Sequence, residues 1–353
     1  MPPTSFLTHG VYKISLVIGF IMAQVRMKVI FGHLNQRDQH AIVSRPTSSL
    51  AGGDVATDGV KFQYTLDNTR LTPAQRAFYE ENGFLVIPNL VPHDKIDQWK
   101  ERFLDLVEGR VESHGMTKMK DISLRNVKGV SGEMIVNKIQ DFVWDEILSE
   151  HCMLPQVLDY VECFTGPNIM AMHTMLINKP PDPGTRTSRH PLHQDLHYFP
   201  FRPANRIVCA WTAMETINND NGCLFVLPGS HKGVLEQHDY PDWEKGVNKM
   251  YHGVRGYDDV PKTMLCMEKG DTVFFHPILL HGSGDNRTKH FRKAISCHYA
   301  ASECHYIDVR GTSQENIGNE VVELAKKRGV DNLNFKDLWK FRSRLVHGTS
   351  INL

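Results

Sequence analysis

The residues best suited to chemistry lie in one short segment, His190-Pro191-Leu192-His193-Gln194-Asp195-Leu196-His197. In an extended chain, side chains two residues apart point to the same side, so His193 and Asp195 would share a face and Gln194 would point to the other. An imidazole and a carboxylate side by side are two of the three ligands of a 2-His-1-carboxylate iron site. The segment therefore predicts part of a metal centre whose third ligand comes from elsewhere in the chain.

The best candidate for the third ligand is His281 in the segment 276–284, and Arg292 follows it eleven residues later. A turn through residues 284–286 would make the two segments antiparallel neighbours, so that Arg292 projects into the same cavity as the metal. A guanidinium group binds a carboxylate through two parallel hydrogen bonds, as a dicarboxylate cosubstrate requires. The order HxD, distal His and Arg thus predicts an iron site with an anchored organic acid.

Two other interpretations of these histidines stay open. His193 and His197 have the i, i+4 spacing of a helical zinc site, which would indicate a zinc hydrolase, although Pro191 nearby and the missing Glu beside His193 speak against it. Each histidine taken singly could also be a core or capping group that is bonded to backbone carbonyls. The ordered set of four residues favours the iron site over both.

Composition limits the remaining possibilities. The 353 residues are 41% hydrophobic, which is enough to form a core, and 40 basic side chains balance 40 acidic ones. A formal charge of zero gives no electrostatic reason to expect a nucleic-acid binder. No stretch reaches the roughly 18 apolar residues that cross a bilayer. Seven scattered cysteines without a CxxC pair indicate buried, reduced thiols rather than disulfides or a cysteine zinc site.

Local patterns predict helices that flank a β core. Thr72-Pro73-Ala74-Gln75 is typical of a helix start, Gly83 would end that helix, and residues 84–87 read as a buried strand. Pro92 would open a second helix with an apolar face. A third helix is expected at residues 335–341. Short apolar runs between turn-forming residues indicate strands, at residues 169–178, 207–214, 223–227, 272–275 and 293–300.

With these motifs, the sequence from Arg26 to the C-terminus resembles the phytanoyl-CoA 2-hydroxylase family of Fe(II)- and 2-oxoglutarate-dependent dioxygenases. The resemblance implies a double-stranded β-helix, or jelly roll, with helical flanks in a domain spanning residues 61–353. Residues 1–60 would be an extension with a targeting segment and a flexible linker at 44–57. The matching stretches are residues 62–66, 78–86, 163–181, 188–201, 222–233 and 268–300.

The resemblance also implies roles for individual residues. Fe(II) would be held by the catalytic residues His193, Asp195 and His281, and 2-oxoglutarate would be anchored by Arg292. Ser283 could share a face with His281, and Lys138 would reach a carboxylate oxygen from the helical flank. Met175 and Trp211 would exclude water. Without such roles, Met175 and Trp211 would be core residues and Lys138 would lie at the solvated surface. The matches to the cosubstrate site are Lys138, Met175, His193, Gln194, Asp195, Trp211, Ser283 and Arg292.

The implied activity is 2-hydroxylation of phytanoyl-CoA and related 3-methyl-branched acyl-CoAs by O2. It would be coupled to oxidative decarboxylation of 2-oxoglutarate to succinate and CO2 in peroxisomal fatty-acid α-oxidation, with ascorbate as a reductant. Two alternatives stay open: a related dioxygenase that acts on other acyl-CoAs, and a non-catalytic jelly-roll protein that binds acyl-CoA.

The N-terminal segment Arg26-Met27-Lys28-Val29-Ile30-Phe31-Gly32-His33-Leu34 resembles a nonapeptide peroxisomal targeting signal, which an import receptor would read. Met27 departs from the branched aliphatic residue usual there, and a chance match in an amphipathic arm is the alternative. The apolar residues 14–23 have the length of a signal-peptide core, so a secreted protein is an alternative, although residues 24–26 offer no small-residue cleavage site. We therefore expect translation to start at Met22 and the leader to be removed within residues 40–49, where an exposed linker is easily cleaved.

Overall fold

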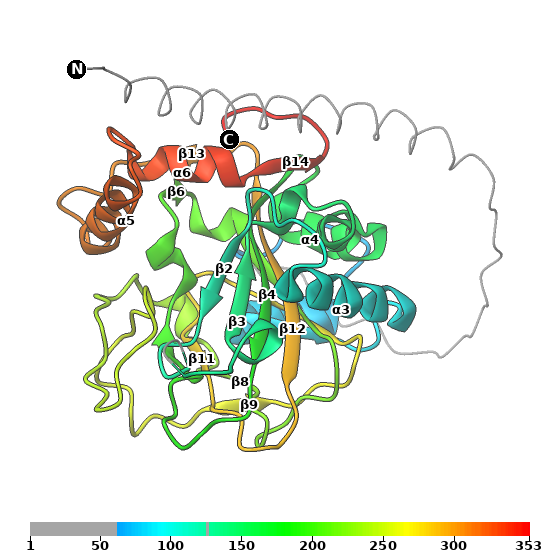
Figure 1. Cartoon of the computed structure of the whole chain (residues 1–353). Helices are drawn as coiled ribbons and strands as arrows, with labels where there is room; N and C mark the ends of the chain where they lie inside the picture. Colours follow the sequence, from blue (N-terminus) through cyan, green and yellow to red (C-terminus); the bar gives the residue numbers. More distant parts are fainter. Residues whose placement is uncertain (1–61, 125–126) are drawn as a thin grey trace. The chain divides into compact units, whose positions relative to one another are not determined.

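The computed structural model describes residues 62–124 and 127–353 (Figure 1). The targeting segment, the linker and the expected start at Met22 lie outside the described residues. No helix in the described ranges is long and apolar enough to cross a membrane. The strands are β1 (Phe84–Ile87), β2 (Thr117–Lys120), β3 (Val136–Gln140), β4 (Ile169–Lys179), β5 (His190–His193), β6 (Phe201–Arg202), β7 (Ile207–Ala213), β8 (Leu224–Val226), β9 (Thr263–Leu265), β10 (Thr272–Phe275), β11 (His281–Ser283), β12 (Arg292–Ala301), β13 (His305–Tyr306) and β14 (Arg344–His347).

Two antiparallel sheets form the core of the fold. The large sheet has the order β1-β10-β7-β12-β4-β3-β2, with β14 paired to another part of β4, and the small sheet has the order β5-β11-β8-β9. β6 and β13 form a separate short pair. Side chains of both main sheets line one cavity, so the sheets face each other as the two layers of a jelly roll. This confirms the predicted fold class, and all six predicted strands are present as β1, β4, β7, β8, β10 and β12.

The helices lie at both ends of the described sequence and between the first strands. Three of them occupy the predicted positions at residues 73–82, 93–108 and 335–342. The α-helices are α2 (Pro73–Asn82), α3 (His93–Glu108), α4 (Pro155–Thr165), α5 (Glu315–Lys327) and α6 (Phe335–Arg342), and the 3-10 turns are η1 (Gly132–Met134), η2 (Phe142–Trp144), η3 (Leu148–Met153), η4 (Asp195–Tyr198), η5 (Ala204–Arg206) and η6 (Ser230–Lys232).

Helix α2 begins and ends as its sequence predicts. The Thr72 hydroxyl accepts a hydrogen bond from the N–H of Gln75, and the Gln75 side chain accepts one from the N–H of Thr72. This capping box satisfies two backbone donors that have no partner within the helix. Gly83 ends the helix at a φ of 79°, a left-handed conformation that costs glycine little. β1 follows at once and becomes the edge of the large sheet.

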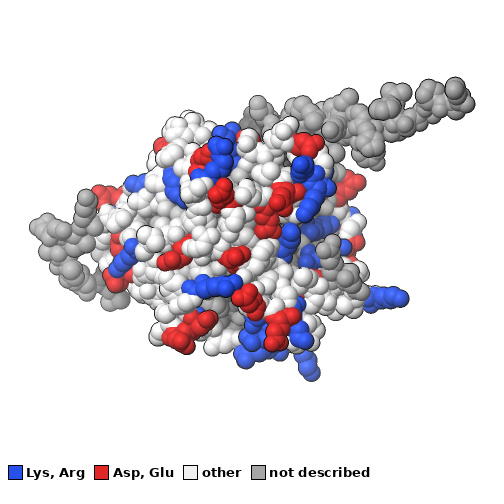
Figure 2. Space-filling model, turned by 90° about the vertical axis from the view of Figure 1, so that its left-hand side faces the viewer, with Lys and Arg blue, Asp and Glu red and all other residues white. Residues whose placement is uncertain are grey.

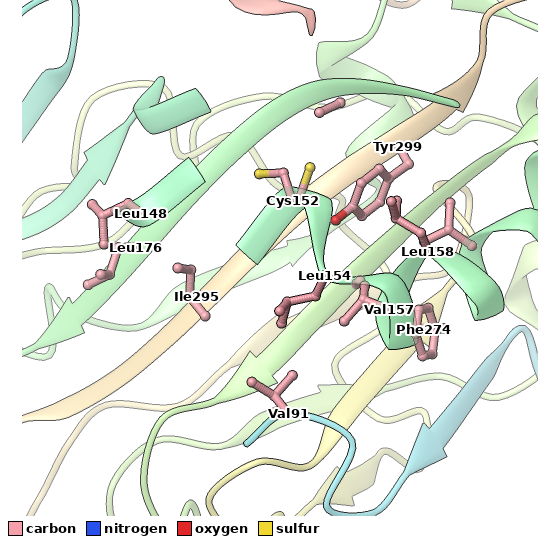
Figure 3. Close-up of a cluster of buried hydrophobic side chains, with 14 of the residues drawn as sticks. Val91, Leu148, Cys152, Leu154, Val157, Leu158, Leu176, Phe274, Ile295 and Tyr299 are labelled. Carbon is pink, nitrogen blue, oxygen red and sulfur yellow. The ribbon is translucent and has the colours of Figure 1, made fainter. Parts of the chain in front are cut away.

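Helices α3 and α4 cover the outer face of the large sheet (Figure 1). The predicted apolar face of α3 is fully buried in the cluster of side chains between helices and sheet. Figure 3 shows Val157 of α4 together with Phe274 and Ile295 of the sheet in this cluster. Burying one such side chain stabilises the fold by roughly 1.5–3 kcal/mol. The buried residues of α3 are Ile96, Trp99, Phe103 and Leu106.

Strand β12 shows how the sheet separates its core from the cavity. Ile295 and Tyr299 pack in the outer cluster beneath the helices, whereas Arg292, Ser296 and His298 line the cavity on the inner face. Side chains alternate between the two faces of a strand, so this single strand both anchors the core and presents polar groups inward.

Strand β4 carries an irregularity opposite β12. His298 pairs with His173, but the next residue, Tyr299, pairs with Ala171, so Met172 is an extra residue on β4. Such a bulge changes which residues of the strand face inward. Beyond it, His173 and Met175 both line cavities on the inner face.

The surface and the thiols agree with the composition. On the face in Figure 2, basic and acidic side chains are interspersed, and neither sign forms an extended patch. All seven cysteines are free; six are buried and Cys266 is exposed. The prediction of buried thiols is confirmed for six of the seven cysteines and is wrong for Cys266.

Candidate metal centre

The three predicted ligands come together although His281 is far from His193 and Asp195 in the sequence. His193 ends β5, His281 begins β11, and the two residues are direct partners in the antiparallel pairing of these strands. Nε2 of His193 lies 3.3 Å from Oδ1 of Asp195, and Nε2 of His281 lies 3.6 Å from the same oxygen. The three donor atoms lie within 4.8 Å of one another, and all three residues are buried. This is the arrangement of donors in a 2-His-1-carboxylate site.

Both histidines are held in the same tautomer. Nδ1–H of His193 donates to the carbonyl of Pro191 at 2.9 Å, and Nδ1–H of His281 donates to the carbonyl of Leu279 at 2.9 Å. In each case the acceptor is two residues earlier in the chain. A proton fixed on Nδ1 leaves the lone pair of Nε2 free for a metal ion. Burial also lowers the pKa of His281 to about 4, which keeps this imidazole neutral near pH 7.

The second oxygen of Asp195 is bonded to a residue of the opposite sheet. Nε2 of His298 on β12 donates to Oδ2 at 2.8 Å, so Oδ1 alone faces His193 and His281. Burial by itself raises the pKa of the Asp195 carboxyl, but the imidazoles of His281, His298 and His193 together hold that pKa well below its usual range. The carboxylate is therefore charged and oriented.

The backbone around the HxD motif differs in part from the prediction. Gln194 is extended, with φ −119° and ψ 127°, so His193 and Asp195 do face the same way. However, Asp195 begins the 3-10 turn η4. The helical zinc site is wrong, because Nε2 of His197 is bonded to Nδ1 of His252 at 3.0 Å and the ring of His197 stacks on that of His238.

Next to the triad lies a cavity between the two sheets, here called the first cavity, with about 670 Å³ of free space including open solvent. Arg292 lines it and is 1% exposed. Its Nη2 donates to the carbonyl of Gly222, whereas Nη1 is buried without a hydrogen-bond partner among the residues that the structure describes. A buried charged donor without a partner costs free energy, so the guanidinium is suited to an anion that enters the cavity.

Lys138 requires a correction. It lies on β3 of the large sheet rather than on the helical flank, and at 7% exposure it is not a solvated surface residue. Burial lowers the pKa of its amine to about 8. Its Nζ lies 4.9 Å from the centre of the Tyr251 ring. The structure therefore places Lys138 at the cavity as predicted, but from a different element.

Ser283, Met175 and Trp211 all line the first cavity, as predicted. The Ser283 hydroxyl accepts a hydrogen bond from Nζ of Lys179 at 2.8 Å, and the Trp211 ring centre lies 5.7 Å from the guanidinium carbon of Arg292. These residues surround the position at which an acid bound to Arg292 would lie.

Gln194 is a second correction, because its side chain lies outside the first cavity. Its amide nitrogen donates to the carbonyls of Val234 and Ile278, and its amide oxygen accepts from the N–H of Glu236. The side chain thus joins the motif to the loop after η6 and does not reach a cosubstrate. This agrees with the alternation expected at residue 194 and disagrees with its assignment to the cosubstrate site.

The expected pairing of the His281 and Arg292 segments is wrong. β11 pairs with β5 and β8 in the small sheet, whereas β12 pairs with β4 and β7 in the large sheet. The connection between them therefore crosses from one sheet to the other. His281 and Arg292 still line the same cavity, one from the small sheet and the other from the large sheet.

Three residues of the site were missed by the sequence analysis. His298 holds Asp195, and Lys179 on β4 pairs in register with Arg292 and donates to Ser283. His190 packs against His193, with ring centres 4.1 Å apart and the ring planes tilted by 37°. His190 belongs to the motif itself, and His298 was within an expected strand, where alternation from Arg292 would have placed it on the same face. No pattern marked Lys179.

Relatives with curated descriptions match almost the whole chain. It is 60% identical over 338 residues to "Phytanoyl-CoA dioxygenase, peroxisomal" of Rattus norvegicus, covering 95% of this chain and 99% of the relative. It is 56% identical over 336 residues to the Homo sapiens protein of that name, covering 94% and 99%. A "Probable phytanoyl-CoA dioxygenase" of Caenorhabditis elegans is 54% identical over 304 residues, covering 82% and 97%.

Solved structures support the fold. The epimerase SnoN, in complex with Fe3+, alpha ketoglutarate and nogalamycin RO, has a TM-score of 0.51 and 18% identity, over 67% of this chain and 86% of SnoN. EctD from S. alaskensis, with 2-oxoglutarate and 5-hydroxyectoine, has a TM-score of 0.52 and 15% identity, over 69% and 81%. The family model described as Phytanoyl-CoA dioxygenase (PhyH) matches residues 79–294, and the chain belongs to this family.

Proposed function

We propose that the protein is an Fe(II)- and 2-oxoglutarate-dependent dioxygenase that hydroxylates phytanoyl-CoA and related 3-methyl-branched acyl-CoAs at C2. The reaction consumes O2 and converts 2-oxoglutarate to succinate and CO2, and ascorbate acts as a reductant for oxidised iron. The observation that carries the proposal is the convergence of three lone-pair donors beside a buried guanidinium that has a free donor. The substrate class comes from the relatives of 54–60% identity.

The residues present fit an iron ion. Nε2 of His193, Nε2 of His281 and Oδ1 of Asp195 carry lone pairs that face one another in a buried space, which is unfavourable unless a cation lies between them. Two imidazoles and one carboxylate suit non-haem Fe(II) and leave coordination positions open. When bound, the iron activates O2 for insertion into a C–H bond.

The residues of the first cavity fit 2-oxoglutarate. Arg292 supplies a planar pair of donors for the distal carboxylate, and Ser283 can donate its hydroxyl hydrogen to the same group, since Lys179 occupies only a lone pair of its oxygen. Lys138 provides a cation on the side nearer to Asp195. These positively charged and hydrogen-bonding groups favour the doubly ionised form of 2-oxoglutarate, which an apolar cavity would disfavour.

The remaining task of the chain is to orient the reactants and to keep water out. Trp211 is 3% exposed and closes the cavity beside Arg292, and His298 keeps Oδ1 of Asp195 turned to the metal position. A site that is dry and preorganised strengthens the electrostatic contacts within it.

The test is substrate-dependent turnover of 2-oxoglutarate. Protein reconstituted anaerobically with Fe(II) and 2-oxoglutarate is exposed to O2 with phytanoyl-CoA, with a straight-chain acyl-CoA of equal length, or with neither. We expect succinate and 2-hydroxyphytanoyl-CoA in equal amounts with the branched substrate. Succinate formation that no acyl-CoA stimulates would contradict the proposal.

We propose further that the protein acts in peroxisomes, as the names of its relatives indicate, and that an import receptor binds residues 26–34. A reporter fused to residues 22–50 should enter peroxisomes. The double variant His33→Ala, Leu34→Ala should leave the reporter in the cytosol. Import of both reporters to the same extent would exclude this signal.

A further inference from the structure

A second cavity adjoins the first at the metal ligands. It has about 680 Å³ of free space including open solvent, within the roughly 300–1,000 Å³ of typical ligand pockets. His193 and Asp195 line both cavities, as do Lys138, Met175 and Tyr251. Arg292 lines only the first, so a cosubstrate bound to it would leave the second cavity free.

The far wall of the second cavity is apolar and comes from the two C-terminal helices. Ile317 and Val321 on α5 and Phe335, Leu338 and Trp339 on α6 line it, and Figure 1 shows the two helices next to each other. These side chains also form a core cluster with Phe201 and Ile207. A wall of this kind selects an apolar occupant, because it offers mostly hydrocarbon contact.

The rim of the same cavity carries cations. Lys249 lines it with a side chain that is 58% exposed, and its Nζ lies 3.6 Å from a carboxylate oxygen of Glu320 on α5. Arg342 at the end of α6 also lines it and forms an ion pair with Asp141, with Nε 3.0 Å from Oδ1. The cavity thus combines an apolar wall, which suits a hydrocarbon chain, with basic side chains, which suit phosphate groups.

We propose that the second cavity is the acyl-chain subsite, in which α5 and α6 hold the branched hydrocarbon chain while the thioester end lies beside His193 and Asp195, which line both cavities. This rests on the proposed function, since it takes the acyl-CoA as the substrate. Each methylene group buried there increases affinity about fourfold. The length of the cavity along α5 and α6, rather than the metal site, then sets the chain-length preference.

The test compares two adjacent residues of α5. Val321 lines the cavity, whereas Val322 is 37% exposed and does not. Binding of phytanoyl-CoA and of 3-methylbutanoyl-CoA, which has the same branch and a short chain, is measured calorimetrically without O2 on protein loaded with Fe(II) and 2-oxoglutarate. Val321→Phe should weaken phytanoyl-CoA binding about tenfold or more, because overfilled sites lose affinity steeply. The short acyl-CoA and 2-oxoglutarate should be unaffected, and Val322→Phe should behave like wild type.

A second variant covers the case in which Val321→Phe does not fold. Val321→Ala removes two methyl groups from the wall and should weaken phytanoyl-CoA binding about two- to tenfold, again without an effect on 3-methylbutanoyl-CoA. Equal effects on both acyl-CoAs, or none on the long one, would overturn the subsite. Chain-length-dependent binding without succinate formation would contradict the proposed function and leave the subsite standing. If acyl-CoA stimulates turnover but the chain-length preference of the Val321 variants equals that of the wild type, the subsite is overturned and the proposed function stands.

Discussion

His298 and Asp195 form a bond between the two sheets: Nε2 of His298 on β12 lies 2.8 Å from Oδ2 of Asp195 at the end of the small-sheet segment. The other oxygen of Asp195 faces the two histidines that complete the triad. One carboxylate therefore has separate partners for its two oxygens, and the large sheet sets the direction in which the small sheet presents its ligand.

This relationship predicts that His298 is a positioning residue. His298→Ala should weaken Co(II) or Fe(II) binding about 10- to 100-fold, the usual effect of losing a group that orients a metal ligand. His298→Gln, which keeps an N–H donor, should restore part of the affinity. Metal titration without substrate measures both variants, and exposed His305 provides the control variant His305→Ala. Unchanged metal affinity in His298→Ala would remove this role.

The triad itself is tested by removing each ligand. His193→Ala, Asp195→Ala and His281→Ala should each abolish hydroxylation and leave the fold intact, because an incomplete facial triad holds iron poorly. Turnover of 2-oxoglutarate and circular dichroism measure the two effects. His290→Ala, at an exposed position, should retain wild-type turnover. Any triad variant that turns over like wild type is not a metal ligand.

Arg292→Lys should raise the concentration of 2-oxoglutarate needed for half-maximal turnover about 10- to 100-fold. Lysine keeps the charge but loses the planar pair of donors, at a cost on the order of 1–3 kcal/mol. Metal affinity should stay the same. Arg287, which is 60% exposed and pairs with Asp220, gives the matched control Arg287→Lys. An unchanged requirement for 2-oxoglutarate in Arg292→Lys would show that the acid binds elsewhere.

The stability of the fold should fall in mild acid because of a buried histidine outside the site. His151 is fully buried against Trp99, and burial lowers its pKa to about 3. Between pH 6.5 and 3 the unfolded chain binds a proton that the folded chain excludes, so stability present above pH 6.5 is lost as the pH falls. This amounts to about 2 kcal/mol by pH 5 for this one residue. Urea unfolding across that range should be less pH-dependent for His151→Leu; an identical slope would contradict the assignment.

Local sequence patterns predicted where the helices and strands lie better than they predicted which strands pair with one another. The capping box at Thr72 and the apolar face of α3 depend on residues within a few turns, and the alternation along β12 depends on one strand. The location of Lys138 did not follow, because Val136–Gln140 mixes polar and apolar residues and its strand character comes from pairing with β4. The partner of β11 did not follow either, since a connection of the same length can close a hairpin or cross between sheets.

The pairing of His193 with His281 also bears on how the protein reaches its native state. Its functional groups come from β3, β4, β5, β7, β11 and β12, and His281 reaches His193 and Asp195 only when the long stretch of chain between them closes into a loop. Folds dominated by such distant pairings have high contact order and fold slowly, and loop-closure entropy opposes them until the sheet is assembled. We therefore expect the contacts among the site residues to form late in folding. Substitutions far from the cavity that slow sheet assembly will reduce the yield of active enzyme without altering the kinetics of the molecules that do fold.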